Sequence, residues 1–324
     1  MIKHLRHALL ACLAGLAVHS LAQAQAPSSG TTVKIVVPFT PGTGMDTIAR
    51  AVAPRLAERL GRPVIVENTP GASGNIGADR VAKSAADGNT VLMGANTMLI
   101  AAQLYKNVAF DPVKDFSPVS MAAWGTLMLV ANPKTGIKTM GDLIAQAKAR
   151  PGHVVYGSPG VGTPHHMAME LFKAQTGLFM LHVPYRGTAG YTQDLLSGEL
   201  NVGFLPVHVA QGFVASGRLN ALAVGSAKRH PVAPTVATFA ELGVKGVDVD
   251  LWYAFFVPAK TPNTTVIRLN TEIAAILQSA DVKELLGKAG LDAESSTPEA
   301  LQAVVAKDYP RWGAVIQRNG ITAE

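Results

Sequence analysis

Short apolar segments alternate with helical patterns along most of this chain. Residues that favour β-structure concentrate in nine short segments, which we predict to be strands. They are VKIVVPF, PVIVEN, TVLMGA, LMLVAN, HVVYGS, FMLHVPY, LNVGFL, LNALAVGS and LWYAFFVPA. Helices are expected between them, near residues 45–60, 77–86, 140–149, 164–176, 189–197 and 208–216. Apolar strands separated by helices favour parallel sheets covered on both faces, and hence an α/β fold.

The pattern changes after residue 264, where three helical segments follow one another with no strand among them. With 324 residues the chain is long enough for two domains, since single cores rarely grow beyond about 250 to 300 residues. No linker-like stretch separates two halves. We therefore expect two discontinuous domains, between which the chain crosses and returns, with the terminal helices packing onto the first.

The first predicted helix carries an apolar stripe at positions 48, 52, 56 and 60, which indicates a buried face. Pro54 cannot donate a hydrogen bond to the carbonyl of Arg50, so we expect a kinked or shortened helix. Asp46 stands at the helix start, where a carboxylate interacts favourably with the helix dipole. An alternative role for Asp46 is to order water in a cleft.

The N-terminal stretch MIKHLRHALLACLAGLAVHSLAQAQA has the basic start, the apolar run and the alternating small residues of a secretory signal peptide. We predict a signal peptide over residues 1–24 and export to the periplasm. A lipid anchor on Cys12 is the alternative, and Leu10 disfavours it because a small residue is preferred there. Cys12 is the only cysteine, so the exported chain relies on its core rather than on disulfides.

Composition and charge exclude some classes of function. With 48% hydrophobic and 15% charged residues the chain is an ordinary globular protein rather than a disordered one. Its formal charge is +6, and loss of Lys3 and Arg6 with the signal peptide leaves +4. The remaining basic residues are scattered, which argues against nucleic-acid binding and indicates only a mild attraction for anions.

Four predicted strands end in elbows that are rich in glycine, serine and threonine and nearly free of acids. They read PFTPGTGMD, GANTM, GSPGVGTPHH and PYRGTAG. Glycine lets backbone N–H groups approach a ligand, hydroxyls can donate, and helix N-termini attract anions. Each elbow alone is better explained as a tight turn and a helix cap. Four of one kind favour a binding site, with a carboxylate as its natural ligand.

No pattern for catalysis or cofactor binding stands out. The glycine spacing around Ser158 does not form a GxSxG elbow, and the glycine-rich stretches lack the residues that complete nucleotide motifs. His165 and His166 are adjacent, so on a helix they point roughly 100° apart and cannot share a metal. We expect no cofactor and no metal, and we interpret His166 and His182 as structural. The enzymatic alternative is a secreted α/β hydrolase that uses Ser158 and His166.

Several segments that occur in order along the chain carry a family resemblance. They are VVPFTPGTGMD, VIVENTPGASGNIGADRVAKSAADGNTVLMG, LYKNVAFDPVKDFSPVSMAAW, GSPGVGTPHHMAMELF, HVPYRGTAGYTQDLLSGELNVGF, GRLNALAVGSAKR and LWYAFFVPAKTP. Together they resemble the Bug family of periplasmic solute-binding proteins, the TctC-like receptors of tripartite tricarboxylate transporters. The resemblance implies a type II periplasmic-binding-protein fold with two lobes, a central ligand cleft and crossing hinge strands. Residues 31–125 and 236–324 would form lobe 1, and residues 126–235 lobe 2.

The resemblance also implies how a ligand is held. A carboxylate of the ligand would bond lobe 2 directly, and ordered waters would link it to lobe 1. The matching positions in lobe 2 are Ser158, Gly162, Thr163, Thr188 and Ala189. Those in lobe 1 are Phe39, Thr43, Asp46, Asn96 and Thr97.

The chain departs from the family pattern at three positions. Thr43 replaces a glycine, Thr69 stands where arginine is common, and Leu205 stands where many members have an aspartate. An aspartate can pair with a ligand ammonium, and a buried ammonium without a partner is costly. Leu205 therefore favours an aromatic or aliphatic di- or tricarboxylate over a free amino acid. The alternative is that Leu205 only packs against neighbouring strands.

The resemblance implies a monomeric, non-enzymatic receptor that closes on a carboxylate and presents it to membrane permease subunits. Presentation to a sensor receptor is an alternative that the sequence does not separate from transport. An effector-binding domain of a transcription regulator is disfavoured, because the chain has an export signal and no helix-turn-helix pattern before Val33.

Overall fold

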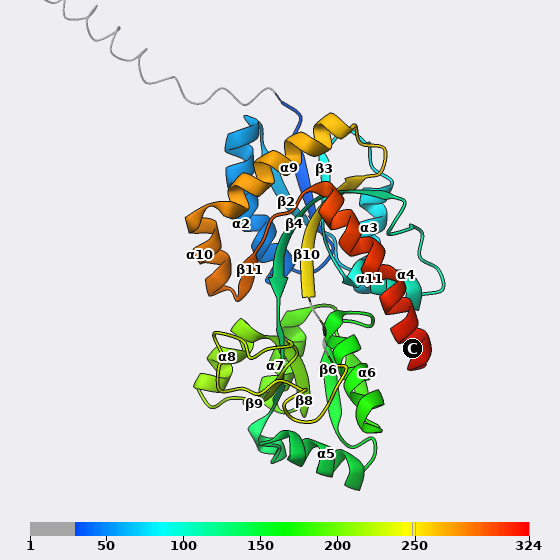
Figure 1. Cartoon of the computed structure of the whole chain (residues 1–324), viewed down its shortest axis with the longest axis vertical. Coiled ribbons are helices and arrows are strands. Elements are labelled where there is room, and N and C mark those ends of the chain that lie inside the picture. Colours follow the sequence, from blue (N-terminus) through cyan, green and yellow to red (C-terminus); the bar gives the residue numbers. More distant parts are fainter. Residues whose placement is uncertain (1–29, 248, 250, 324) are drawn as a thin grey trace, which may run out of the picture.

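The computed structural model describes residues 30–247, 249 and 251–323, so the predicted signal peptide and Cys12 lie outside the described residues. Two lobes stack along the long axis of the molecule, each built around one sheet with helices on its faces (Figure 1). The predicted α/β class with two lobes is confirmed.

Lobe 1 contains a six-stranded sheet in the order β11-β4-β10-β3-β1-β2. β1 pairs in parallel with β2 and β3, whereas β10 runs antiparallel to β3 and β4, and β11 antiparallel to β4. The strands are β1 (Val33–Val37), β2 (Val64–Asn68), β3 (Thr90–Ala95), β4 (Phe116–Gly125), β10 (Leu251–Pro258) and β11 (Leu291–Ala293). The helices are α2 (Gly44–Leu60), η1 (Ala72–Gly74), α3 (Asn75–Ala82), α4 (Thr97–Leu104), α9 (Asn263–Gln278), α10 (Ala280–Lys288) and α11 (Pro298–Arg318).

Lobe 2 contains a five-stranded sheet in the order β7-β6-β8-β5-β9, in which β5 is antiparallel to both of its neighbours and β6 is parallel to β7 and β8. The strands are β5 (Leu127–Ala131), β6 (Val155–Ser158), β7 (Leu181–Pro184), β8 (Val202–Pro206) and β9 (Asn220–Val224). The helices are η2 (Pro133–Thr135), α5 (Met140–Ala149), α6 (Pro164–Thr176), α7 (Thr188–Ser197) and α8 (Val207–Ala215).

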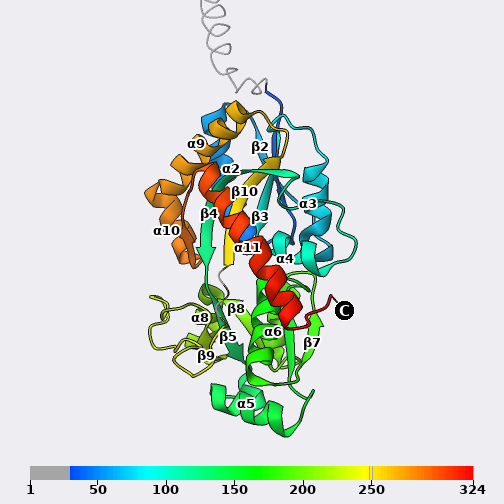
Figure 2. The ribbon, with the colours of Figure 1, turned by 45° about the vertical axis from the view of Figure 1, so that its right-hand side comes forward.

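The chain crosses between the lobes at the ends of long strands. Only Thr126 separates β4 of lobe 1 from β5 of lobe 2. The return leads into β10, and the end of α11 then reaches down beside α6 (Figures 1 and 2). Phe239 still packs in lobe 2, with ring centroids 5.9 Å from Phe172 and 5.8 Å from Phe204. We therefore place the return crossing between residue 239 and β10 rather than at the predicted residue 236.

Two expectations about the elements are wrong. The sheets are mixed rather than parallel, because strands that run straight from one lobe into the other, such as β4 into β5, lie antiparallel to strands of both sheets. A strand, β11, interrupts the C-terminal helices. Pro54 does not shorten α2, which continues past it to Leu60, whereas a kink at this position stays a prediction. Pro54 is exposed, so water can satisfy the Arg50 carbonyl that it leaves without a donor.

The core of lobe 1 is organised by β10, whose eight residues are all buried. Tyr253 and Phe255 face one apolar cluster, whereas Trp252 and Phe256 face another. This alternation is the period of two of a β-strand, and here both faces are covered by helices. β10 therefore holds Tyr253 rigidly at the boundary with lobe 2.

Candidate functional site

A small cavity lies between the lobes at the point where five helices begin. We call it the inner cavity, and its volume is about 40 Å³. Lobe 1 contributes Phe39, Thr43, Gly44, Met45, Thr97 and Tyr253, among others, and lobe 2 contributes Pro159, Thr163, Pro164, His165, Thr188 and Pro206. Thr43, Thr163 and Pro206 are the N-caps of α2, α6 and α8, and Thr97 and Thr188 are the first residues of α4 and α7.

The helix starts make the inner cavity electropositive. Each helix N-terminus carries about half a positive charge and N–H groups without partners in the helix. Among the described residues, no acidic side chain lines this cavity. No side chain caps the first turn of α7, so no capping group competes with a ligand for its first backbone N–H groups. The arrangement suits an anion, with a carboxylate as the most common small-molecule case.

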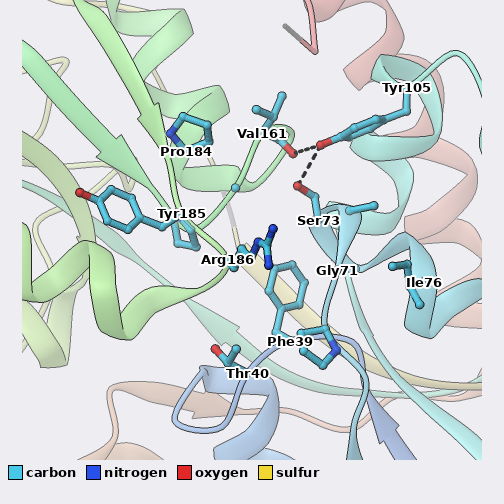
Figure 3. Close-up of a pocket in the computed structure, with 15 residues that line it drawn as sticks. Phe39, Thr40, Gly71, Ser73, Ile76, Tyr105, Val161, Pro184, Tyr185 and Arg186 are labelled. Atoms are coloured by element: carbon cyan, nitrogen blue, oxygen red, sulfur yellow. Dashed lines mark hydrogen bonds between the residues drawn. The ribbon is translucent and has the colours of Figure 1, made fainter.

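A larger cavity opens beside it, also between the lobes (Figure 3). We call it the outer cavity, and its volume is about 640 Å³. Phe39 and Pro159 line both cavities. Its other walls include Pro70, Ile76 and Tyr105 of lobe 1 and Val161, Pro184 and Arg186 of lobe 2. This volume falls within the usual range for small-ligand pockets, about 300 to 1,000 Å³.

The lobes touch around these cavities. The Tyr105 hydroxyl donates to the carbonyl of Val161 over 3.5 Å and lies 3.2 Å from Ser73 Oγ (Figure 3). A Cβ atom at Gly187 of lobe 2 would lie 2.2 Å from Thr40 Oγ1 of lobe 1. The two lobes are therefore in direct contact beside the cavities.

Five of the predicted site residues line the inner cavity. They are Phe39, Thr43, Thr97, Thr163 and Thr188. Thr163 and Thr188, which belong to different elbows, thus share one crevice. The convergence agrees with the general rule that ligands bind where the ends of strands and the starts of helices meet.

Asp46 is buried just behind the inner cavity and supports the first elbow. Its carboxylate accepts hydrogen bonds from Gly42 N at 3.0 Å, Arg50 Nε at 2.9 Å and Asn68 Nδ2 at 3.0 Å. Burial alone would raise the pKa of Asp46, but these donors and the Arg50 charge outweigh it and lower the pKa. Asp46 thus holds the turn, and its carboxylate is already engaged.

Ser158, the last residue of β6, and Gly162, in the loop that follows it, line neither cavity. Ser158 Oγ is 2.7 Å from His182 Nε2 and hydrogen-bonds both main-chain groups of Gly160. Gly162 N donates to His166 Nδ1 over 3.2 Å, and the rings of His166 and His182 stack with centroids 4.3 Å apart. His166 and His182 therefore support the loop of residues 159–163 between β6 and α6, which we call the ligand loop.

This geometry does not favour the hydrolase alternative. The imidazole that meets Ser158 belongs to His182, not to the predicted His166, whose Nδ1 accepts from Gly162 N instead. Ser158 is fully buried and lines neither cavity. A nucleophile must reach its substrate, so this serine acts as a loop support.

The other predicted residues lie outside the cavity walls. Asn96 is buried at the N-cap position of α4, and Ala189 follows Thr188 on the exposed start of α7. Leu205 is fully buried in an apolar cluster of lobe 2 with Met128 and Tyr191. Thr69 is on the surface, where its hydroxyl accepts from Arg80 over 3.3 Å.

Sequence reasoning missed His165 and Tyr253, which both line the inner cavity. Neither nitrogen of His165 has a hydrogen-bond partner, although the residue is only 8% exposed. Burial lowers the pKa of His165 to about 3, so the ring is neutral. The sequence could have identified His165 as a site residue, because it lies close to Thr163 at the start of the same helix. Tyr253 gives no such signal, because its strand is apolar throughout.

Within the described residues no cluster of three or more potential metal ligands occurs. None of the helices in that part of the chain combines the length and the apolar character that a membrane span requires.

Comparison with known proteins identifies the family. A family model described as "Tripartite tricarboxylate transporter family receptor", TctC, matches residues 48–321. The chain belongs to the TctC family. BugT of Bordetella pertussis is 35% identical to it over 290 residues, which cover 89% of each chain. The resemblance to the Bug and TctC-like receptors is thereby confirmed, and the chain is a periplasmic solute-binding protein of this family.

Solved structures of TctC-like proteins share the fold. Rpa4515 of R. palustris, solved with adipate, superposes with a TM-score of 0.86 at 34% identity and covers 91% of this chain and 99% of its own. MatC of Rhodopseudomonas palustris, solved with bound malate, gives a TM-score of 0.83 at 29% identity and covers 88% and 98%. Both of these structural neighbours therefore hold small carboxylates on the same two-lobe framework.

Proposed function

We propose that this protein captures a carboxylate-bearing small molecule between its lobes and delivers it to the membrane subunits of a tripartite tricarboxylate transporter. The ligand we expect is an aromatic or aliphatic di- or tricarboxylate rather than a free amino acid. The observation that carries this proposal is the convergence of five helix starts, from both lobes, on one small cavity.

The surroundings of the cavities disfavour a ligand ammonium. Among the described residues, neither cavity is lined by an aspartate or a glutamate. The nearby carboxylate of Asp46 is already engaged by Arg50, and Leu205 is buried in the apolar core of lobe 2. A buried ammonium would therefore lack a charged partner, which is costly. The adipate and malate bound by two relatives are both acids without an ammonium.

Calorimetric titration of the mature protein tests the ligand class. The ligands are a panel of mono-, di- and tricarboxylates, each paired with its neutral amide. We expect binding of at least one acid and loss of binding by its amide, because the helix starts favour the negative charge. Equal binding of acid and amide, or binding of neither throughout the panel, would contradict a carboxylate receptor.

The Thr163→Ala variant tests the location of the site. Thr163 Oγ1 accepts from His166 N and donates to Gly160 O, so the substitution loosens the ligand loop. Thr139 caps α5 in the same way, far from the cleft. Both variants should lose about 1 kcal/mol of stability. Only Thr163→Ala should weaken ligand binding, by about tenfold; an equal effect of Thr139→Ala would place the site elsewhere.

Uptake measurements test delivery to a transporter. Cells that lack the gene for this chain should lose uptake of the acid identified by calorimetry, wild-type protein should restore it, and Thr163→Ala should restore it poorly at low acid concentration. Undiminished uptake without the protein would exclude this transport role and would favour presentation to a sensor.

A further inference from the structure

We propose that Arg186, at the outer cavity, binds a second carboxylate of the ligand, so that the cleft selects dicarboxylates with an apolar spacer. One carboxylate would occupy the inner cavity and the other would face the Arg186 guanidinium. Arg186 can play this part only if the cleft binds carboxylates as proposed above.

The sizes of the two cavities suggest this division. The inner cavity, at about 40 Å³, is only a few times the roughly 10–15 Å³ that a cavity needs to hold one water molecule. It suits a single small polar group and not a whole ligand. The outer cavity, at about 640 Å³, has room for the remainder. Because Phe39 and Pro159 line both, the two cavities are adjacent, and a ligand that occupies both would lie beside these side chains.

Arg186 is the charged residue of the outer cavity among the described residues that line it. It is exposed, and within the part of the chain that the structure describes it forms no hydrogen bond or ion pair. Its side chain extends from the lobe 2 loop toward the side formed by Phe39 (Figure 3). An arginine without a partner presents a planar set of donors that fits a carboxylate in bidentate fashion.

The backbone that carries Arg186 is well fixed. On one side Tyr185 N donates to the carbonyl of Ser158 over 2.9 Å, and the Tyr185 hydroxyl donates to Asp194. On the other side Gly187 has φ +142°, a conformation that L residues rarely adopt. Arg186 thus projects from a braced loop, and binding requires ordering of its side chain alone.

Between the two polar ends the outer cavity is mainly apolar. Pro70 and Ile76 of lobe 1 face Val161 and Pro184 of lobe 2. Apolar walls favour burial of a hydrocarbon spacer, by about 0.8 kcal/mol for each buried CH₂ group. The ligand class is therefore an aliphatic or aromatic dicarboxylate rather than a compact polyhydroxy acid.

Chain-matched pairs of acids test this role by titration calorimetry. The pairs are butanoate and succinate, hexanoate and adipate, octanoate and suberate, and 4-methylbenzoate and terephthalate. For the best-fitting pair, wild-type protein should bind the dicarboxylate at least about tenfold more tightly than the monocarboxylate, as expected for a charge-assisted contact. Arg186→Gln should reduce this ratio to about threefold or less and leave monocarboxylate binding within about twofold.

Arg150→Gln is the matched control. Arg150 is also an exposed arginine of lobe 2, but it lies at the end of α5, at the far end of the lobe (Figure 1). The Arg150→Gln variant removes the same charge and should leave the ratio of dicarboxylate to monocarboxylate affinity unchanged. An unchanged ratio in Arg186→Gln, an equal loss in Arg150→Gln, or equal wild-type binding of mono- and dicarboxylates would overturn the role of Arg186. Failure of every acid to bind would instead overturn the carboxylate receptor itself.

Discussion

At the scale of single residues, the side chains around the inner cavity divide into those already engaged and those still free. The Thr163 hydroxyl donates its hydrogen to Gly160 O at 2.7 Å, so its part in binding is to hold the loop. Asp46 likewise serves the first elbow. His165, with two unpartnered nitrogens, is free, as is Arg186 at the outer cavity. Buried polar groups without partners cost about 1–3 kcal/mol, so an occupant that pairs with His165 recovers that cost.

Asp46→Asn tests the support of the first elbow. Gly42 N and Arg50 Nε donate to Asp46 Oδ2, and Asn68 Nδ2 donates to Asp46 Oδ1. In either orientation the asparagine amide places its NH₂ group against a donor, so at least one of these hydrogen bonds is lost. We expect a loss of about 1–3 kcal/mol in the free energy of unfolding at pH 7, measured by urea denaturation. Asp292→Asn, on the exposed face of β11, should change it by less than about 0.5 kcal/mol. Equal losses in the two variants would contradict the role of Asp46.

At the scale of elements, the site depends on helix starts brought together by two separate sheets. α2 and α4 start at the ends of β1 and β3 in lobe 1, whereas α6, α7 and α8 follow β6, β7 and β8 in lobe 2. In the structure the loop before α7 lies against the loop before α2, where Gly187 meets Thr40. The absence of a side chain at Gly187 permits this approach.

A double-mutant cycle tests that contact. Gly187→Ala places a methyl group 2.2 Å from Thr40 Oγ1 and should keep the lobes apart, weakening ligand affinity by about tenfold. Thr40→Ala alone should have little effect. In the double variant the nearest Thr40 atom is Cβ, at 3.4 Å, so affinity should partly recover. Titration calorimetry gives the coupling, and a double variant no better than Gly187→Ala would show that backbone strain, not the contact, is responsible.

At the scale of the whole molecule, folding buries histidines and so couples stability to pH. Burial lowers the pKa of His165 to about 3 and that of His166 to about 4, whereas an unfolded chain has histidines near 6.5. Above about pH 7.5 both states are neutral and pH has no effect through these rings. Below 6.5 the unfolded chain binds protons that the folded protein excludes, so stability falls as the pH falls toward 4.

Urea denaturation at pH 7.5 and pH 5 measures this effect. Each buried ring should lower the free energy of unfolding by up to about 1.4 kcal/mol per pH unit over the lower part of this range. His165→Leu removes one such ring without breaking a hydrogen bond and should reduce the dependence. His153→Gln, at an exposed position, should leave it unchanged. A stability that does not differ between the two pH values would contradict burial of neutral histidines.

The local sequence pattern was sufficient to predict the bounds of an element where the residues of that element specify it. β3, α5 and α6 have the predicted bounds residue for residue, because α5 and α6 begin at threonine caps and β3 is a compact apolar run. Local pattern failed for β4 and α4, which were not predicted. Pro118 and the alanines of β4 are poor strand formers, and this strand is held by its long-range pairing with β10.

The sequence by itself determined the chemistry of the site: elbows of glycine and hydroxyl residues, helix starts behind them, and hardly any acid. These are properties of short segments, so they follow from local composition. Only the tertiary structure decided which elbows meet, that Ser158 pairs with His182 rather than His166, and that Arg186 has no partner. The physical reason is that these relations join residues far apart in the chain, and strand order and crossing, not local propensity, set their distances.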